Sequence, residues 1–387
     1  MALPARRAAA GCGLPIRVVS RRLVRASDPS IRPHVLAVSH LDLYANTEQC
    51  ALTCVYPKPP TGAGDFDAVV AAFEAHMPAY LNYFFPMAGR IVVDPSSGIP
   101  ELHCYNQGAE LIVAHAGVEL SALDWSLSGE SLKRIHVPYA QDMVLSVQLL
   151  SFTCGGLAVL VRTGTISGGG PNHDRSVLRQ FSRPRDPPTY GASVAAMYTR
   201  WEHEQEVNAL TAEESFIERL YYVDERDIAR LRGEASAEGR QRATRVQAVS
   251  AYLWKAVTLT PADYDELYQQ MVDWMEVHKP TNFVETPAIG LGSPTLAQTM
   301  WSSFPNDTDF GFGEAALAMP VHQNLGRLCM GLICITPKPA DPGTWIVSAF
   351  IWPRLAAVLE SDEQRIFKPL TAEFLGLTRG HGLRPRL

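Results

Sequence analysis

His173 and Asp174 are the most suggestive pair of reactive side chains, because a neutral imidazole can accept a proton near pH 7 and a carboxylate can orient it. The two residues are adjacent in the sequence, however, and do not lie one helical turn apart. A glycine-rich run precedes them. This context is typical of a solvated loop, and we therefore expect His173 to take no part in catalysis.

Two other patterns in the same stretch do not match known catalytic loops. Gly168-Gly169-Gly170 lacks the Lys-Ser/Thr pair that follows a phosphate-binding loop, so we interpret it as a flexible linker. Thr165-Ile166-Ser167-Gly168 does not fit the G-x-S-x-G pattern, which argues against a serine hydrolase.

The cysteines do not indicate a metal site. Cys50 and Cys54 have no second pair of ligands at the spacing that zinc sites use. The seven cysteines are scattered along the chain: Cys12, Cys50, Cys54, Cys104, Cys154, Cys329 and Cys334. We expect reduced thiols and no bound metal.

Length and composition set the broad class of the protein. The chain has 387 residues, enough for two domains, with 47% hydrophobic and 19% charged residues. A formal charge of −6 gives no reason to expect binding to nucleic acid or to an anionic membrane. No apolar run approaches the roughly 18 residues that a membrane-spanning helix needs. We expect a cytoplasmic monomer.

The N-terminal arginines allow two interpretations. Six arginines precede the first acidic residue, Asp28, as in an organelle transit peptide. The alternative is that Ile16-Arg17-Val18-Val19 opens the first strand of the fold, and we favour this second interpretation.

Apolar periodicity then predicts the elements of the first half. A helix is expected from Phe66 to Phe84, kinked or interrupted at Pro78. The runs 143–152 and 157–161 are rich in β-formers and flank a Cys-Gly-Gly turn, which predicts a hairpin. Residues 164–191 are rich in Gly, Pro, Arg and Ser and predict a long crossover between domains.

The second half predicts helices followed by strands. Thr244 and Gln247 have the spacing of a capping box at the start of one helix. Thr260-Pro261 begins another, which Pro280 ends. A hairpin is expected around residues 339–343. Strands mixed with amphipathic helices indicate an α/β or α+β chain in two halves.

Three stretches carry a resemblance to a known family. Residues 83–90 (YFFPMAGR) resemble the Y-F-P-L-A-G-R segment of the plant BAHD acyl-CoA-dependent acyltransferases. Residues 145–160 resemble the strand pair that leads to that family's active site. The third stretch resembles the D-F-G-W-G signature with Phe in place of Trp: Asp309, Phe310, Gly311, Phe312 and Gly313. The resemblance spans nearly all of 16–377, and the sequence of residues 260–320 is similar to the sequences of grass members of the family.

This resemblance implies the fold and the reaction. The family has two chloramphenicol-acetyltransferase-like domains with mixed sheets, flanking helices and a tunnel between them. An acyl-CoA enters as co-substrate from one side, and a small alcohol or amine acceptor enters from the other. The histidine of an H-x-x-x-D motif takes the acceptor's proton. The D-F-G-W-G segment is held to be structural, so Asp309, Gly311 and Gly313 are expected to form a tight turn with an ion pair.

The catalytic motif itself is missing from this sequence. None of the eleven histidines is followed by aspartate at the fourth position. The family places the motif after the strand that matches Leu157–Val161, but here Val161 is followed directly by Arg162-Thr163-Gly164. The motif and its helix are therefore absent between Val161 and Arg162, and no catalytic residue can be named.

A second join runs from Val257 to Thr258, where relatives have second-domain strands and the basic partner of the signature aspartate. Two clean joins in otherwise family-like sequence favour a gene-model or splicing artefact over gradual decay. The crossover arginines allow two interpretations, contact with CoA phosphates or a solvated basic segment: Arg162, Arg175, Arg179, Arg183 and Arg185.

These observations define the expected organisation and two rival functions. We expect an extra segment at 1–15, an N-terminal domain at 16–163, a crossover at 164–191 and a C-terminal domain at 192–387, incomplete in both halves. The first hypothesis is acyl transfer, with hydroxycinnamoyl as one candidate group, from CoA to a hydroxyl or amine. The second is a catalytically dead relative of the same fold that binds acyl-CoA, a phenolic ligand or nothing at all. The missing motif favours the second for this chain.

Overall fold

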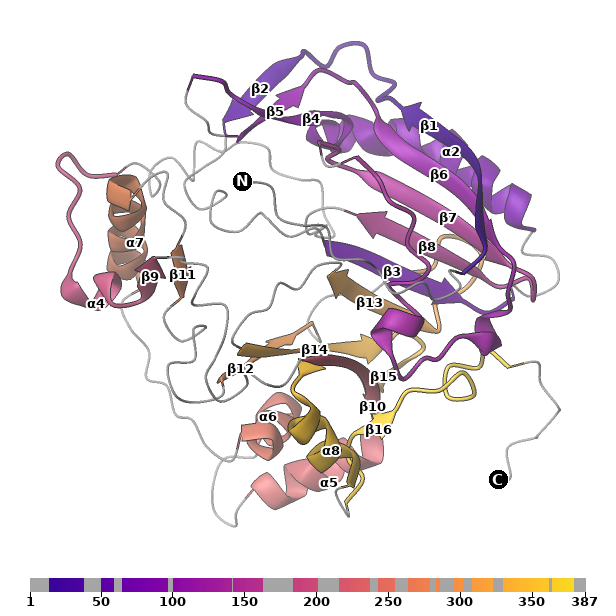
Figure 1. The fold of residues 1–387 in the computed structure, drawn as a ribbon. Helices are drawn as coiled ribbons and strands as arrows, with labels where there is room; N and C mark the ends of the chain where they lie inside the picture. The colour runs from indigo at the N-terminus through magenta and orange to yellow at the C-terminus, as the bar shows by residue number, and fades with distance from the viewer. Residues whose placement is uncertain are drawn as a thin grey trace, which may run out of the picture.

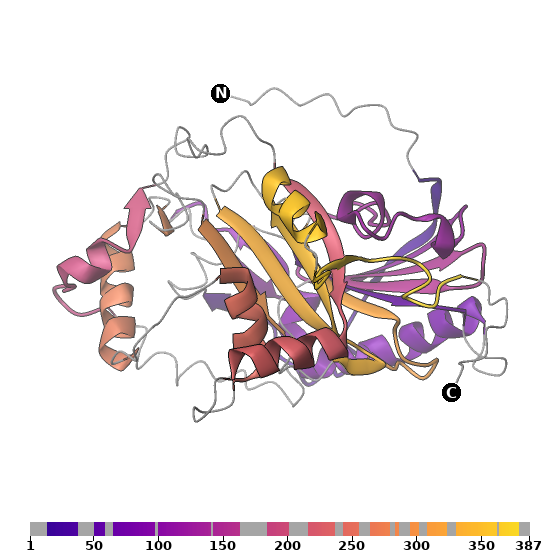
Figure 2. The ribbon, with the colours of Figure 1, turned by 90° about the horizontal axis from the view of Figure 1, so that it is seen from below.

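The computed structural model describes residues 14–37, 50–58, 65–96, 100–140, 142–162, 184–200, 216–236, 243–254, 264–278, 283–285, 295–301, 308–322, 330–361 and 364–378. Two mixed β-sheets pack against each other, and helices cover the outer side of each (Figures 1 and 2). This is the two-domain α/β architecture that the sequence predicts. No helix in the described ranges is long and apolar enough to cross a membrane.

The first sheet has six strands. Their order is β1 (Ile16–Val24), β6 (Ala109–Ala116), β7 (Ser146–Phe152), β8 (Leu157–Arg162), β3 (Cys50–Tyr56) and β13 (Leu317–His322). Only β6 and β7 pair in parallel; the other neighbours are antiparallel. The first strand and the β7–β8 hairpin are confirmed.

Helix α2 (Phe66–Tyr83) covers the outer face of this sheet. The Asp65 side chain accepts a hydrogen bond from the amide of Ala68 at 3.0 Å, which begins the helix. The buried residues Val69, Met77 and Leu81 pack on Leu157 and Val159 of β8. Pro78 lies inside the helix but does not end it. A 3₁₀ turn, η1 (Phe85–Ala88), follows.

A small sheet and two further turns complete the N-terminal half. The small sheet has the order β2 (His34–Ala37), β5 (Pro100–Cys104) and β4 (Arg90–Val93). The 3₁₀ turns η2 (Leu120–Ala122) and η3 (Ser128–Glu130) lie in the connection from β6 to β7. That long connection lets β6 and β7 run parallel.

The second sheet has five strands. Their order is β12 (Thr295–Met300), β14 (Met330–Lys338), β15 (Asp341–Ile351), β10 (Ile217–Val223) and β16 (Lys368–Pro369). The β14–β15 hairpin is the predicted one around residues 339–343.

Three helices lie on the outer face of the second sheet: α5 (Glu225–Ala235), α6 (Arg245–Trp254) and α8 (Pro353–Ser361). The predicted capping box of α6 is confirmed. Thr244 Oγ1 accepts from the Gln247 amide at 3.1 Å, and Gln247 Oε1 accepts from the Thr244 amide at 2.9 Å.

A separate small unit contains α4 (Ala192–Ala195), β9 (Tyr198–Arg200), α7 (Tyr264–His278) and β11 (Phe283–Glu285), and it lies apart from both sheets in Figures 1 and 2. Val194, Tyr198, Trp274 and Met275 form its core. The fully buried carboxylate of Asp273 accepts from the amides of Arg185 (2.8 Å) and Thr189 (3.1 Å). The end of the expected crossover is thereby fixed to α7.

Two stretches late in the chain return to the first sheet. Strand β13 pairs with β3, from Leu317 opposite Val55 to His322 opposite Cys50. Residues 370–377 contribute Leu370, Leu375 and Leu377 to the core that holds the two sheets together. The N-terminal sheet is thus completed by residues from the expected C-terminal domain.

Several expectations lie outside the described residues. These are His173-Asp174, the glycine run 168–170, most of the crossover, the helix start expected at Thr260-Pro261 and the join between Val257 and Thr258. They stay predictions.

Candidate functional site

The candidate site is the polar end of an otherwise apolar sheet face. On β8, Ala158 and Leu160 point away from α2, toward Leu220 and Ile346 of the second sheet. Arg162 falls on this inner face by alternation. One end of the face is therefore hydrophobic core, and the other end carries polar side chains. We call these the polar cluster: Thr53, Glu110, His136, Ser146, Gln148 and Arg162.

Arg162 is the last residue of β8. Its residue exposure is only 1%. Nη2 donates to Oε1 of Gln148, and the guanidinium carbon lies 4.7 Å from the centre of the Tyr139 ring. Among the described residues, Nε and Nη1 have no acceptor. Burial lowers the pKa of Arg162 to about 10, so the group is still charged at neutral pH.

Gln148 fixes a segment of chain over the polar cluster. Its Nε2 donates to the carbonyl of Ile135 at 2.8 Å, and its Oε1 accepts from the amide of Val137 at 2.9 Å. The segment 135–139 consequently lies across the ends of β7 and β8 and brings in His136 and Tyr139.

His136 is the histidine that the structure places beside Arg162. Its Nε2 lies 3.1 Å from Oγ1 of Thr53. Burial, and then the charges of Arg162 and Lys133, lower the pKa of His136 to about 3. A general base works best with a pKa near the working pH, so this imidazole is a poor proton acceptor at pH 7.

Glu110 of β6 lies in the same row as Arg162 across the sheet, on the far side of Ser146. Its carboxylate accepts from Nη1 of Arg21 at 2.9 Å and from Oγ of Ser146 at 2.8 Å. Both oxygens are therefore engaged, and the carboxylate is oriented away from a role as a free base.

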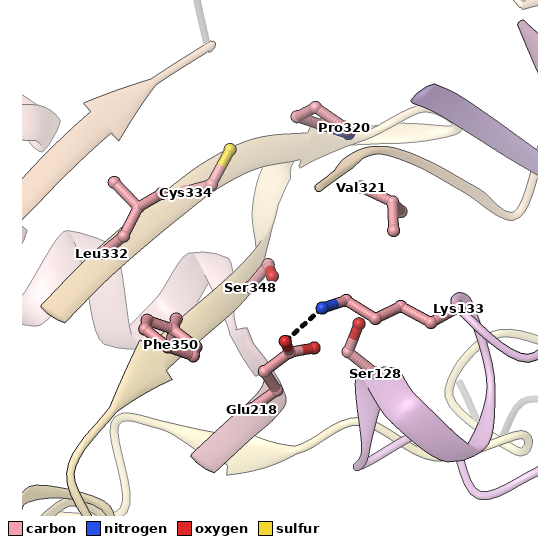
Figure 3. Close-up of a pocket in the computed structure, with 9 residues that line it drawn as sticks. All are labelled: Ser128, Lys133, Glu218, Pro320, Val321, Leu332, Cys334, Ser348 and Phe350. Carbon is pink, nitrogen blue, oxygen red and sulfur yellow. Dashed lines mark hydrogen bonds and ion pairs between the residues drawn. The ribbon is translucent and has the colours of Figure 1, made fainter. Parts of the chain in front are cut away.

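A small cavity lies between the two sheets (Figure 3). Its volume is about 20 Å³, room for about one water molecule. Lys133 of the first half forms an ion pair with Glu218 of β10 at the edge of this cavity. It is lined by Ser128, Lys133, Glu218, Pro320, Val321, Leu332, Cys334, Ser348 and Phe350.

One histidine, His115, has an acidic residue at the family spacing, although the residue is a glutamate and not an aspartate. His115 is followed four positions later by Glu119, a pair that a search for H-x-x-x-D passes over. His115 Nδ1 is hydrogen-bonded to Ser151 Oγ on β7, and its ring lies 5.4 Å from the Phe66 ring. These contacts give His115 a packing role between β6, β7 and α2.

The signature residues form a tight turn against the first sheet. Oδ1 of Asp309 accepts from the amides of Gly311 (2.8 Å) and Gly313 (2.9 Å). Both glycines have positive φ, 95° and 104°. The buried Phe312 packs edge-on to Tyr56 at 4.8 Å, and Tyr56 donates to the carbonyl of Thr308 at 2.7 Å. The turn thus fixes the point where the chain re-enters the first sheet.

The described crossover arginines do not form one surface. Arg162 is buried, while Arg185 lies 3.5 Å from the Asp273 carboxylate in the separate unit. Arg175, Arg179 and Arg183 lie outside the described residues. In the described ranges no group of three or more His, Cys, Asp or Glu residues could hold a metal ion.

Sequence reasoning missed His136, Gln148 and Thr53. A signal for two of them was present. Gln148 and Thr53 occupy inward positions of strands whose neighbouring inward residues, Leu150 and Val55, are apolar core. His136 lies in an irregular segment with no periodicity, and only the fold brings it to the cluster.

Comparison with known proteins finds a family match in the N-terminal half of the chain. The family model described as "Transferase family" matches residues 14–164, from the start of β1 to just beyond β8. Vinorine synthase of Rauvolfia serpentina is 26% identical over 64% of this chain and 61% of its own length. Putrescine hydroxycinnamoyltransferase 1 of Oryza sativa subsp. japonica is 28% identical over 37% of this chain and 33% of its own. The chain therefore spans less than two thirds of these curated relatives.

Solved structures share the fold. The crystal structure of vinorine synthase matches with a TM-score of 0.54 and 18% identity, over 94% of this chain and 98% of that chain. TRI101 of F. graminearum, complexed with coenzyme A and T-2 mycotoxin, matches with a TM-score of 0.61 and 10% identity, over 87% and 99%. Residues 14–164 thus match the Transferase family, and the fold is that of the solved structures of vinorine synthase and TRI101.

Proposed function

We propose that this chain is a BAHD-type acyltransferase scaffold that holds an acyl-CoA and a small hydroxyl or amine acceptor but, with this sequence, does not transfer the acyl group. The observation that carries the proposal is the end of β8. A buried arginine stands there, and the one histidine beside it has a pKa of about 3.

The chemistry of acyl transfer explains why an arginine and a weakly basic histidine at the end of β8 would leave the chain without turnover. The acceptor's oxygen or nitrogen forms a bond to the thioester carbon, the carbon–sulfur bond breaks, and the acceptor's proton ends on the sulfur of CoA. A positioned base that carries this proton contributes about 10²–10⁴-fold. His136 is too weak a base, Glu110 is held by Arg21 and Ser146, and Arg162 has no lone pair to offer.

The relatives support a substrate class. One relative's name is putrescine hydroxycinnamoyltransferase 1, which is consistent with a hydroxycinnamoyl donor and an amine acceptor. We extend this class to the present chain as the ligands of its scaffold, and we propose a cytoplasmic monomer that uses acyl-CoA only as a co-substrate.

The test separates binding from turnover. The purified chain is titrated with 4-coumaroyl-CoA in a calorimeter, and CoA release is then followed with phenolic, alcohol and amine acceptors. Binding without CoA release supports the proposal. CoA release that His136→Asn abolishes would make His136 the base and overturn it, whereas activity that only His173→Ala abolishes would assign the role to His173.

Transcript sequencing addresses the origin of the missing motif. Reads across codons 161–162 and 257–258 that contain additional in-frame sequence with an H-x-x-x-D motif would identify an active acyltransferase as the product of this locus. Reads that join these codons directly would establish the chain described here as the natural protein.

A further inference from the structure

The buried guanidinium of Arg162 has more hydrogen-bond donors than the protein satisfies. Nη2 is bound to Gln148, but Nε and Nη1 have no acceptor among the described residues. Buried polar groups in folded proteins are nearly always paired, and a buried charge without a partner is costly. An arginine that is 1% exposed with two unpaired donors therefore requires an explanation.

The charges around Arg162 do not balance. Glu110 is the nearby carboxylate, but it already accepts from Arg21 and Ser146. Lys133 is paired with Glu218. Three of the described charged groups around Arg162 are positive and two are negative, so one positive charge is left without a counter-charge. The positive groups are Arg21, Lys133 and Arg162, and the negative groups are Glu110 and Glu218. His136 adds none at neutral pH, since its pKa is about 3.

We propose that Arg162 is the anchor of a binding site for a small monocarboxylate, whose single negative charge and oxygen acceptors match the one unbalanced charge and the unpaired donors. Arginine and carboxylate form strong, charge-assisted hydrogen bonds. A phosphate group carries more negative charge than the cluster can neutralise, so a carboxylate fits better. This site goes beyond the proposed function, because it requires neither CoA nor acyl transfer.

The cover of the site is Tyr139. Its ring stacks on the guanidinium at 4.7 Å and is itself partly exposed, in a segment without regular secondary structure. Movement of this ring gives a small anion access to the guanidinium, while Gln148 keeps Nη2 in place.

The test is thermal unfolding with added anions at constant ionic strength. Sodium acetate and sodium benzoate are the probes, with sodium chloride and acetamide as controls. We expect both carboxylates to raise Tm in a saturable manner, by about 2–4 °C at ten times the Kd, and chloride and acetamide to leave it unchanged. No response to carboxylates up to 100 mM, or an equal response to chloride, would overturn the proposal.

Three variants link the response to Arg162. Arg162→Met should lose the carboxylate response and, without ligand, melt at or above the parent's temperature, because an unpaired buried charge has been replaced by an apolar group. Arg162→Lys keeps the charge without the planar donors and should raise the Kd about tenfold. Arg134→Met removes a surface arginine that pairs with Glu130, and should respond as the parent does.

The responses of the two Arg162 variants decide whether the site exists. An unchanged response in Arg162→Met contradicts the site. If Arg162→Met does not fold, the Kd of Arg162→Lys decides, and a value equal to the parent's contradicts the site.

Discussion

Oε1 of Gln148 accepts hydrogen bonds from two groups at once, Nη2 of Arg162 and the amide of Val137. This one side chain ties the end of β8 to the irregular segment that covers it. Position 148 is fully buried, and it lies on the face of β7 that otherwise packs against the second sheet. The position of Arg162 and the fixation of the segment that carries His136 thus depend on the same residue.

Replacing Gln148 should be strongly destabilising. Gln148→Ala leaves the Val137 amide, the Ile135 carbonyl and Arg162 with fewer partners in a buried place, which should cost about 2–5 kcal/mol of unfolding free energy. Urea denaturation of parent and variant measures this. Gln107→Ala is the matched control, because Gln107 makes one exposed backbone contact, to Tyr105, and should cost under about 1 kcal/mol. Equal losses in the two variants would contradict the network.

The low pKa of His136 should appear as a loss of stability in mild acid. The unfolded chain takes up a proton at His136 near pH 6.5, while the folded protein resists it down to about pH 3. The stability that depends on the neutral ring is present above pH 6.5 and is lost as the pH falls toward 3. One such proton changes the unfolding free energy by about 1.4 kcal/mol per pH unit.

The comparison with His136→Asn isolates this proton. Between pH 7 and pH 5 the parent should lose up to about 2 kcal/mol more unfolding free energy than the variant. His76→Asn serves as a control on an exposed histidine of α2 and should leave the slope unchanged. Parallel pH curves for the parent and His136→Asn would show that His136 titrates normally in the folded protein.

Asp273 should hold the stretch 184–191 on α7. Burial raises the pKa of its carboxyl, but the hydrogen bonds from the amides of Arg185 and Thr189 outweigh this and the net pKa is lowered. Asp273→Ala should expose those two amides to solvent, and hydrogen exchange at Arg185 and Thr189 should accelerate by at least about tenfold. Asp142→Ala, at an exposed aspartate, is the control. Unchanged exchange would mean that other contacts fix the segment.

Much of the fold was visible in the sequence because local signals and tertiary packing agree there. The α2 face, the capping box at Thr244 and the two hairpins each combine a periodicity with a turn or cap. Pro78 is an exception. The sequence predicts a kink or an interruption of the helix there, yet the helix continues to Tyr83, held against the sheet by Met77 and Leu81.

The site was much less predictable. Its residues come from β3, β6, β7, β8 and the segment 135–139, and they meet only through long-range pairing. The return of β13 to the first sheet is equally non-local. No period or motif in the sequence encodes which strand becomes its neighbour.

The signature turn depends on glycine at position 313. Gly313 has a φ of 104° and no atom within 4 Å of an added Cβ, so Gly313→Ala tests backbone conformation without a clash. A residue with a side chain that is held at such a positive φ costs about 1–3 kcal/mol of unfolding free energy. Gly129 has equal space and no positive φ, so Gly129→Ala is the matched control and should change stability by under about 1 kcal/mol. Equal effects on urea denaturation would show that the turn relaxes freely.

The carboxylate of Asp309 supplies the other half of this turn, and two substitutions separate its acceptor role from its charge. Asp309→Asn retains an oxygen that can accept from Gly311 and Gly313, and should cost under about 1 kcal/mol. Asp309→Ala removes the acceptor and should cost about 1–2 kcal/mol. Denaturation curves for both variants give the comparison. A loss in Asp309→Asn as large as that in Asp309→Ala would mean that the negative charge, and hence an ionic partner, matters more to this turn than the two amide hydrogen bonds.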